Sequence, residues 1–323
     1  MKMSKRTTSS LIAVAAATSL LAACSSAKGD AEASADYPTD DITLVVPYDA
    51  GGASDLAART LAAEMENTLD VSVIVENRTG GAGSVGLSSL AGSDADGYTL
   101  GYMPVETVML GHQGYDIDPE AYDYLGQIVS VPATIAVPAD SPYQTLQDLI
   151  DAATENPDTL TVSNSGAGSI WHAVTTALNE ATGAALKPVP FDGGAPAVTA
   201  AIGGQVDAVI AGVSETSQAH KDGQIRVLAV LADDPADALP DVKTAKDLGI
   251  DVSMGGWGLL GAPAGLPEEV IEVLDAAVEA AVASDSYVDV ITKAGNIPAW
   301  RSAAETQGFV TDEATRFGTI LAD

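Results

Sequence analysis

Four glycine-rich segments are the part of this sequence best suited to bind a ligand. They cover residues 47–55, 80–86, 163–169 and 191–196, and each follows a short apolar run typical of a strand. Glycine lets backbone N–H groups converge on one point, and a helix that begins there adds positive potential. All but the second segment lead into helical patterns, and none of the four contains Arg or Lys. They predict an anion site in which backbone N–H groups and hydroxyls hold a carboxylate without a formal cation.

A catalytic role for these segments is the main alternative. Residues 81–86 match the G-x-G-x-x-G spacing of dinucleotide sites, which would suit a secreted dinucleotide-dependent enzyme. The match lies a few residues past its strand, however, and not on the turn itself. No G-x-S-x-G or H-E-x-x-H sequence occurs, and His112, His172 and His220 are too scattered to form a recognisable metal site. We therefore expect a binding protein with no catalytic residue, metal or cofactor.

Strands and helices that would position these segments alternate along the chain. Ser54 or Asp55 is expected to cap the first helix, and residues 145–148 form a capping-box pattern. Pro267 opens a later helix with acidic residues in its first turn. This alternation predicts an α/β fold with mostly parallel sheets. The predicted strands are at residues 42–46, 71–75, 98–102, 134–137, 160–163, 206–211, 225–230 and 257–261.

Proline and glycine divide the chain after residue 36 into two predicted lobes. Pro138 and Pro142 mark one crossing between them, and Gly255, Gly256 and Pro263 mark the other. We expect lobe 1 to contain residues 37–137 plus 263–323 and lobe 2 to contain residues 138–262. A hinge with two crossings suits closure around a ligand.

The first 24 residues form a pattern typical of an export signal. Three basic residues precede an apolar run at 11–23, which is too short to form a stable membrane span. Small residues then lead to Cys24, the only cysteine, in an arrangement that resembles the bacterial lipobox. We predict a lipoprotein signal peptide over residues 1–24, a lipid on Cys24 and a flexible tether over residues 25–36. The protein would then be anchored to the outer or periplasmic face of the cell membrane, without a disulfide.

The charge of the chain limits its partners. It contains 14 Lys and Arg residues against 45 Asp and Glu residues, for a net charge of −31. So negative a surface argues against nucleic acid and against anionic lipid as partners. Screening confines this field to roughly 8 Å at physiological salt, so local donors can still bind an anion.

Several motifs together resemble the substrate-binding proteins of tripartite tricarboxylate transporters, the Bug family. The resemblance covers essentially the whole chain after the signal, in family order. Where the family commonly has phenylalanine, this chain has Tyr48, and Ala50 and Lys243 stand where prolines are usual. Asp192 replaces a common lysine and removes a positive charge near the site, which bears on the class of ligand. The motifs are residues 45–55, 75–83, 96–100, 163–172, 189–197, 203–207, 228–230, 239–242 and 262–265.

The resemblance implies a type II periplasmic-binding-protein fold, with two α/β lobes, a hinge and a ligand cleft between the lobes. It implies an extracytoplasmic solute-binding lipoprotein that captures a small organic carboxylate, such as a di- or tricarboxylate. The partners would be this ligand and the membrane components of a tripartite tricarboxylate transporter, and the protein is expected to be a monomer and not an enzyme. The predicted ligand-binding residues are Tyr48, Ala50, Gly51, Gly52, Ser54, Asp55, Ser163, Asn164, Gly168, Ser169, His172, Gly193, Gly194, Asp207 and Trp257.

Some of these residues have a structural interpretation beside the functional one. His172, one turn into its helix, could contact the ligand or pack in the core. Asp207 is unexpected beside an anion site unless it bonds to nearby loop N–H groups or receives a ligand amine, and the structural role is favoured. Trp257, at the second crossing, could line the cleft or belong to the core. Arg78 is expected to brace its loop by pairing with Glu76.

Overall fold

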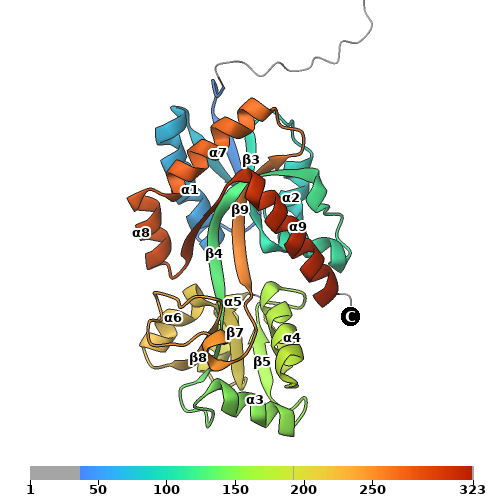
Figure 1. Ribbon diagram of the computed structural model, residues 1–323, viewed down its shortest axis with the longest axis vertical. Coiled ribbons are helices and arrows are strands. Elements are labelled where there is room, and N and C mark those ends of the chain that lie inside the picture. The colour runs from blue at the N-terminus through green and yellow to red at the C-terminus, as the bar shows by residue number, and fades with distance from the viewer. Residues whose placement is uncertain (1–36, 192, 322–323) are drawn as a thin grey trace, which may run out of the picture. The chain divides into compact units, whose positions relative to one another are not determined.

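The computed structural model describes residues 37–191 and 193–321 (Figure 1). The predicted signal peptide, Cys24, the predicted tether and Asp192 lie outside these residues. Within the described ranges, no helix is long and apolar enough to cross a membrane.

One group of strands is built around β1 (Ile42–Val46). β1 runs parallel to β2 (Val73–Asn77) and β3 (Thr99–Pro104), and β3 pairs antiparallel with β9 (Gly255–Pro263). β9 and β10 (Ile297–Arg301) both run antiparallel to the long strand β4 (Tyr122–Pro138). The helices of this part of the chain are α1 (Ala53–Leu69), α2 (Ser84–Ala91), α7 (Glu268–Val282), α8 (Asp285–Lys293) and α9 (Ala303–Ile320).

A second group of strands is built around β5 (Thr161–Asn164). β5 runs parallel to β6 (Lys187–Pro190) and β7 (Ala208–Gly212). β7 and β8 (Ile225–Leu231) pair antiparallel with the last part of β4. The helices here are α3 (Leu146–Glu155), α4 (Ile170–Thr182), α5 (Gly194–Ile202) and α6 (Val213–Lys221). Short 3₁₀ turns complete the described chain at η1 (Gly81–Gly83), η2 (Val105–Val108), η3 (Leu110–Gln113), η4 (Pro119–Ala121) and η5 (Lys246–Leu248).

Strand β4 belongs to both groups. Its residues from Tyr122 to Pro132 pair with β9, and those from Ala133 to Pro138 pair with β7 and β8 (Figure 1). The α/β prediction is confirmed, but the prediction of mostly parallel sheets is wrong, because β4 and β9 run antiparallel to their neighbours. An apolar pattern gives the period of a strand and not its direction.

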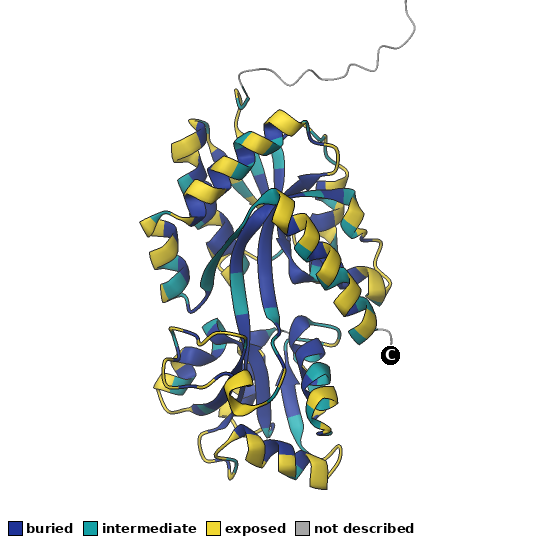
Figure 2. Cartoon of the chain, in the orientation of Figure 1, coloured by how far each residue is buried: buried dark blue, intermediate teal, exposed yellow. Residues whose placement is uncertain are grey.

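Buried strands between layers of helices hold the ends of the glycine-rich segments in place. Leu44, Val45 and Val46 on β1 are all buried, which is typical of a parallel strand covered on both faces. Figure 2 shows the same pattern elsewhere, with buried strands and helices whose outer faces are exposed. The glycine-rich segments begin where β1, β5 and β6 leave this core, so their first residues are fixed by it.

Candidate functional site

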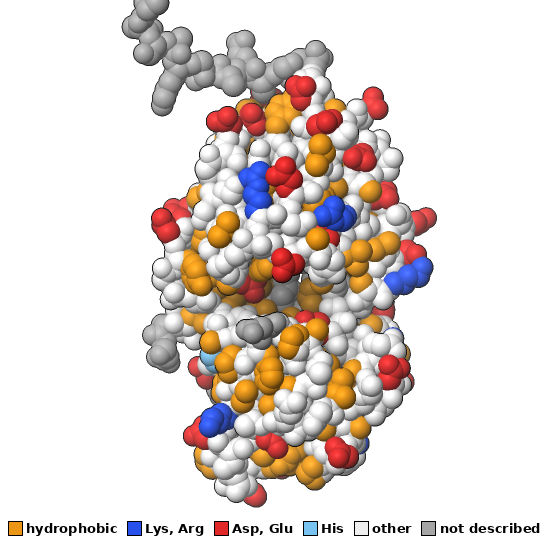
Figure 3. All heavy atoms as spheres, turned by 180° about the vertical axis from the view of Figure 1, so that it is seen from behind, with side chains coloured by type: hydrophobic (Ala, Val, Ile, Leu, Met, Phe, Trp, Pro, Cys, Tyr) orange, Lys and Arg blue, Asp and Glu red, His pale blue; other side chains and the backbone are white. Residues whose placement is uncertain are grey.

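A cavity of about 700 Å³ lies where several of these strands end. It is lined by segments that follow β1, β3, β5, β6 and β7 and by the start of β9, so both groups of strands contribute to it. Figure 3 shows the hollow from the side opposite to Figure 1, with acidic side chains at its rim. The space just beyond the carboxyl ends of parallel strands is the usual ligand position in open α/β sheets.

About half of the residues predicted to bind ligand line this cavity. Each of the three helix-initiating segments contributes two of them. Gly52 and Ser54 come from the segment before α1, Gly168 and Ser169 from the segment before α4, and Gly193 and Gly194 from the segment before α5. The lining residues from the predicted set are Tyr48, Gly52, Ser54, Gly168, Ser169, Gly193, Gly194 and Trp257. The structure places the remaining predicted residues outside the lining: Ala50, Gly51, Asp55, Ser163, Asn164, His172 and Asp207.

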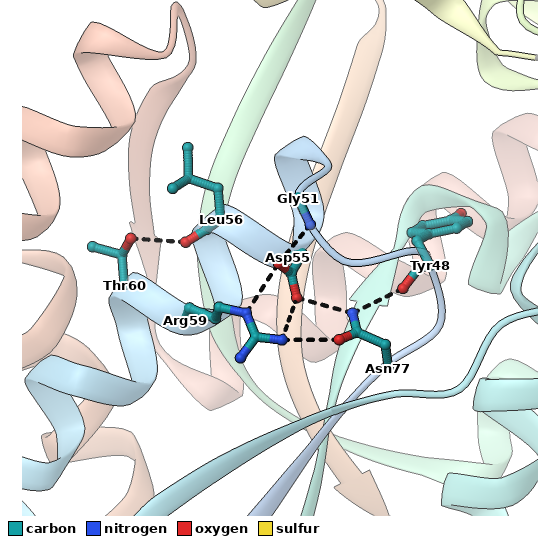
Figure 4. Close-up of polar contacts among 7 residues, drawn as sticks. All are labelled: Tyr48, Gly51, Asp55, Leu56, Arg59, Thr60 and Asn77. Atoms are coloured by element: carbon teal, nitrogen blue, oxygen red, sulfur yellow. Dashed lines mark hydrogen bonds and ion pairs between the residues drawn. The ribbon is translucent and has the colours of Figure 1, made fainter.

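A polar network around Asp55 fixes the segment after β1 (Figure 4). The carboxylate accepts hydrogen bonds from the Gly51 N–H at 2.8 Å, from Arg59 Nε at 3.0 Å and from Asn77 Nδ2 at 2.9 Å. Asn77 Nδ2 also donates to the Tyr48 carbonyl at 2.9 Å. Burial alone would raise the pKa of Asp55, but its bonds to Arg59, Gly51 and Asn77 hold that pKa below its ordinary value. Asp55 therefore acts as a charged brace for the loop.

Helix α1 begins without a side-chain cap. Its N-cap is Gly52, which makes no side-chain capping bond, so the prediction that Ser54 or Asp55 caps this helix is wrong. The carboxylate of Asp55 bonds instead to the Gly51 N–H, which lies before the helix. The first N–H groups of a helix have no partner within it. The N–H groups of Gly52, Ala53 and Ser54 can therefore face the cavity that these residues line.

The segment before α4 is held by neutral groups. Ser169 is the N-cap of α4, and its hydroxyl oxygen accepts from the His172 N–H at 3.3 Å. The Gly168 N–H donates to His172 Nδ1 at 2.9 Å, and Gln113 Nε2 donates to the Gly168 carbonyl at 2.6 Å. Burial lowers the pKa of His172, which favours the neutral ring that this acceptor role needs. His172 thus positions the loop from behind the cavity wall.

Ser163 and Asp207 bind strands to their neighbours. The Ser163 hydroxyl donates to the Ala197 carbonyl at 2.9 Å, which joins β5 to α5. The Asp207 carboxylate accepts from the Thr161 N–H at 2.8 Å and from the Thr161 hydroxyl at 2.7 Å, which joins the start of β7 to β5. Asn164 is buried, and its side-chain oxygen accepts from the Gly166 N–H at 3.0 Å. These contacts shape the framework behind the cavity.

The structure also adds two acidic residues that the sequence interpretation missed. Glu106 lies just after β3, and its Oε2 accepts from the Tyr48 hydroxyl at 3.0 Å. Glu215, in the first turn of α6, accepts from the Gly212 N–H at 2.8 Å. Burial raises the pKa of both carboxyl groups. Their positions directly after strand ends are the sequence signal that could have identified them.

Aromatic side chains form part of the wall. Tyr48, Tyr102, Trp171 and Trp257 all line the cavity. Trp257 is 5% exposed, and its Nε1 donates to Glu313 on α9 at 3.0 Å, so it serves both as lining and as core. Other lining residues absent from the predicted set include Asp49, Gln113, Ser165 and Ser214.

The fourth glycine-rich segment contributes little to the cavity. Of residues 80–86, only Ala82 lines it. A Cβ at Gly86 would lie 2.8 Å from the Pro47 Cα, so this glycine permits close packing of α2 against the segment after β1. The neighbouring Arg78 forms the expected pair with Glu76, with a nitrogen–oxygen distance of 2.8 Å. The geometry assigns this segment a packing role, which removes the main support for a dinucleotide site.

Comparison with known proteins identifies related sequences and folds. The family model described as tripartite tricarboxylate transporter family receptor matches residues 57–323. BugT of Bordetella pertussis is 30% identical over 295 residues, which are 89% of this chain and 90% of that protein. A solute-binding protein from Polaromonas, solved without ligand, is 28% identical with a TM-score of 0.79, covering 88% of this chain and 99% of that one.

Two further solved structures contain a ligand. A Rhodopseudomonas palustris protein solved with adipate is 28% identical with a TM-score of 0.78, covering 88% of this chain and 98% of that one. MatC from the same organism, solved with malate, is 26% identical with a TM-score of 0.76, covering 88% of this chain and all of that one (100%). The predicted fold is therefore confirmed as a mixed α/β fold that matches periplasmic solute-binding proteins.

Proposed function

The chain belongs to the tripartite tricarboxylate transporter receptor family, and from this premise we propose that it captures a small organic carboxylate outside the cytoplasmic membrane and delivers it to such a transporter. The family and its structural relatives are solute-binding receptors and not enzymes, so binding without turnover is the expected activity. The relatives solved with adipate and with malate support a carboxylate as the ligand class.

The observation that carries this proposal is that two helices begin at one cavity. The starts of α1 and α4 supply Gly52, Ala53 and Ser54 on one side and Ile170 and Trp171 on the other. The N–H groups of these residues have no partner within their helices, carry partial positive charge and can bind a carboxylate directly. The N–H groups of Gly168 and Ser169 are already bonded to His172 and Gly166. A carboxylate in this position would need no arginine or lysine.

Closure of two lobes around the ligand is part of the proposal. Lobe 1 would contain residues 37–137 plus 263–323, and lobe 2 residues 138–262, with β4 and β9 as the connecting strands. A carboxylate that bonds to α1 in lobe 1 and to α4 in lobe 2 would bind the closed form more tightly than the open form. The ligand would shift the population toward closure by that difference in affinity.

Anchoring through a lipid on Cys24 is also proposed, on the sequence pattern alone. The Cys24→Ser variant should accumulate as an unprocessed or released protein when it is expressed in a bacterium that processes lipoproteins. A variant that is still cleaved at the same bond and still carries a covalent lipid would contradict this assignment.

The test of carboxylate binding is calorimetric titration of the protein with a panel of mono-, di- and tricarboxylates, including malate and adipate. Gly52 has φ −78°, which any residue can adopt, so Gly52→Val should fold normally while its side chain covers the first N–H groups of α1. We expect its affinity to fall at least about ten-fold, as loss of a hydrogen bond to a charged group implies.

A matched control for this variant is Gly308→Val, on the exposed side of α9, where nothing lies within 4 Å of an added Cβ. It should bind as the wild-type protein does. Wild-type affinity in Gly52→Val, with the fold intact by circular dichroism, would mean that the carboxylate binds elsewhere.

A further inference from the structure

The charges that line the cavity are all of one sign. Asp49, Glu106 and Glu215 line it, and among the lining residues that the structure describes there is no lysine or arginine. A ligand with two or three carboxylates would place further negative charge next to these groups, at a cost that grows as the local dielectric falls. A ligand with a single carboxylate and a positive charge avoids that cost.

Glu106 has unused capacity to accept hydrogen bonds. The structure shows one of its oxygens accepting from the Tyr48 hydroxyl at 3.0 Å, and a carboxylate can accept about four such bonds. Burial raises its pKa, which is the effect expected for an acid that lacks a nearby cation. A positively charged ligand group would relieve this unfavourable environment.

Glu215 occupies the approach to α5. A Cβ built on Gly194, the first residue of that helix, would lie only 1.7 Å from Glu215 Oε1, so the carboxyl group rests directly against the helix start. The same side chain bonds to the Gly212 N–H at 2.8 Å through its other oxygen. The protein thus places its own carboxyl group where a ligand carboxylate could otherwise meet α5. This leaves α1 and α4 as the anion-binding helix starts.

The aromatic lining fits a cation as well. Tyr48, Tyr102, Trp171 and Trp257 line the same cavity as the two glutamates. Aromatic faces attract ammonium groups, and quaternary ammonium ligands are typically held between such rings. The cavity therefore combines anion-binding helix starts, at α1 and α4, with carboxylates and aromatic rings that can bind a cation.

We propose that the ligand is a zwitterion, with a carboxylate at the starts of α1 and α4 and a protonated or quaternary nitrogen beside Glu106 and Glu215. This inference rests on the proposed carboxylate-binding function and narrows its ligand class to amino acids and betaines.

Isosteric pairs of ligands test the proposal, because each pair differs only in nitrogen against carbon. Suitable pairs are 4-aminobutanoate with pentanoate, glycine betaine with 3,3-dimethylbutanoate, and aspartate with 2-methylsuccinate. Calorimetric titration should show that the nitrogen compound of at least one pair binds about ten-fold or more tightly than its carbon partner, as a charge-assisted contact implies. The pair that responds distinguishes primary from quaternary nitrogen.

Glutamine variants separate recognition from structure. Glu106→Gln and Glu215→Gln keep the side-chain size and an oxygen that can accept from Tyr48 or Gly212, but they remove the charge. In each variant, the affinity for the nitrogen compound divided by that for its carbon isostere should fall toward one, because binding of the nitrogen compound is lost. Glu272→Gln, an exposed position on α7, is the charge-matched control and should keep the wild-type ratio.

The outcomes separate this inference from the function on which it rests. Carbon isosteres or dicarboxylates that bind as tightly as the nitrogen compounds would overturn the zwitterion proposal and leave carboxylate binding standing. A wild-type ratio in both glutamine variants would also overturn it. Both proposals would be overturned if choline, which has no carboxylate, binds as tightly as the zwitterions. They would also be overturned if no compound in the panel binds.

Discussion

The two glycine-rich segments that open α1 and α4 look alike in sequence but are held by different forces. The segment after β1 is tied to a buried carboxylate, Asp55, which is 3% exposed and paired with Arg59 at 3.0 Å. The segment after β5 is tied by neutral bonds, from the Gly168 N–H to His172 and from Gln113 to the Gly168 carbonyl. The first brace lies within one group of strands. The second includes a bond from Gln113, which follows β3, to a residue that follows β5.

This difference suggests a division of labour at the site. An ionic brace with several simultaneous partners costs a large free energy to break, so the start of α1 should be a fixed set of donors. Neutral bonds, one of which would have to break when the lobes separate, allow the start of α4 to adjust with the ligand. The three predictions below test this contrast, beginning with the largest expected effect.

Removing the ionic brace should destabilise the whole protein. In Asp55→Ala, the Gly51 N–H, Asn77 and Arg59 lose their shared acceptor, while Arg59, whose side chain is 48% exposed, can turn to water. We expect the free energy of unfolding to fall by about 2–4 kcal/mol, as for a buried charge with several hydrogen bonds. Urea unfolding followed by circular dichroism measures this change.

The control for this variant is an ion pair with the same spacing on the surface. Asp289 and Lys293 are also four residues apart in a helix, with side chains 59% and 74% exposed. Asp289→Ala should change the free energy of unfolding by less than about 0.5 kcal/mol. Equal effects of the two variants would show that Asp55 is no more than a surface charge.

Removing the cap of α4 should have a smaller effect on stability and a visible effect on binding. Ser169→Ala loses the bond from the His172 N–H to the Ser169 hydroxyl, and N-cap losses of this kind cost about 1 kcal/mol. Because Ser169 lines the cavity, its hydroxyl hydrogen can donate to a ligand carboxylate, and its loss should weaken the free energy of binding by about 1.5–3 kcal/mol.

Ser169→Asn is the informative comparison, because asparagine caps a helix nearly as well but cannot place a hydroxyl there. It should restore the stability measured by urea unfolding and leave the affinity measured by calorimetry reduced. If both quantities return to wild-type values, the Ser169 hydroxyl does not contact the ligand.

The contrast between the two segments also shows what the sequence could and could not predict. Glycine and a following helical pattern identified both segments, because these are local features of the chain. The distant anchors were not predictable, since they come from Asn77 and Gln113, whose positions depend on the tertiary fold. His172, only four residues after Gly168, was in the predicted set, but its bond to the Gly168 N–H was not predicted. Glu106 and Glu215 were missed because an anion site gave no reason to look for acids.

The fold was predictable to a similar extent. Periodicity located most strands to within two or three residues. Of the long strand β4, it predicted only residues 134–137 and missed the rest. It gave no strand direction. β6 and β10 were missed because both contain proline, which argues against a strand in a sequence pattern. Their pairing with β5 and β4 is a tertiary property.

As the pH falls, the segment that leads into α4 should weaken at a higher pH than the segment that leads into α1. This is the smallest effect we predict. Burial lowers the pKa of His172 below its ordinary value of 6.5, so the unfolded chain takes up this proton more readily than the folded protein. Stability that depends on neutral His172 is therefore complete above about pH 6.5 and is lost as the pH falls through the lower folded-state pKa. The pKa of Asp55 is held below 3.8, so its brace persists to more acidic conditions.

Urea unfolding of the wild-type protein and His172→Leu tests this. The free energy of unfolding should be higher in the wild type by up to about 1 kcal/mol at pH 7.5, and this excess should shrink at about pH 5. Glu106 and Glu215 titrate in both proteins, so their contributions cancel in the difference. An excess that stays constant over this pH range would mean that the bond from Gly168 to His172 does not depend on the neutral ring.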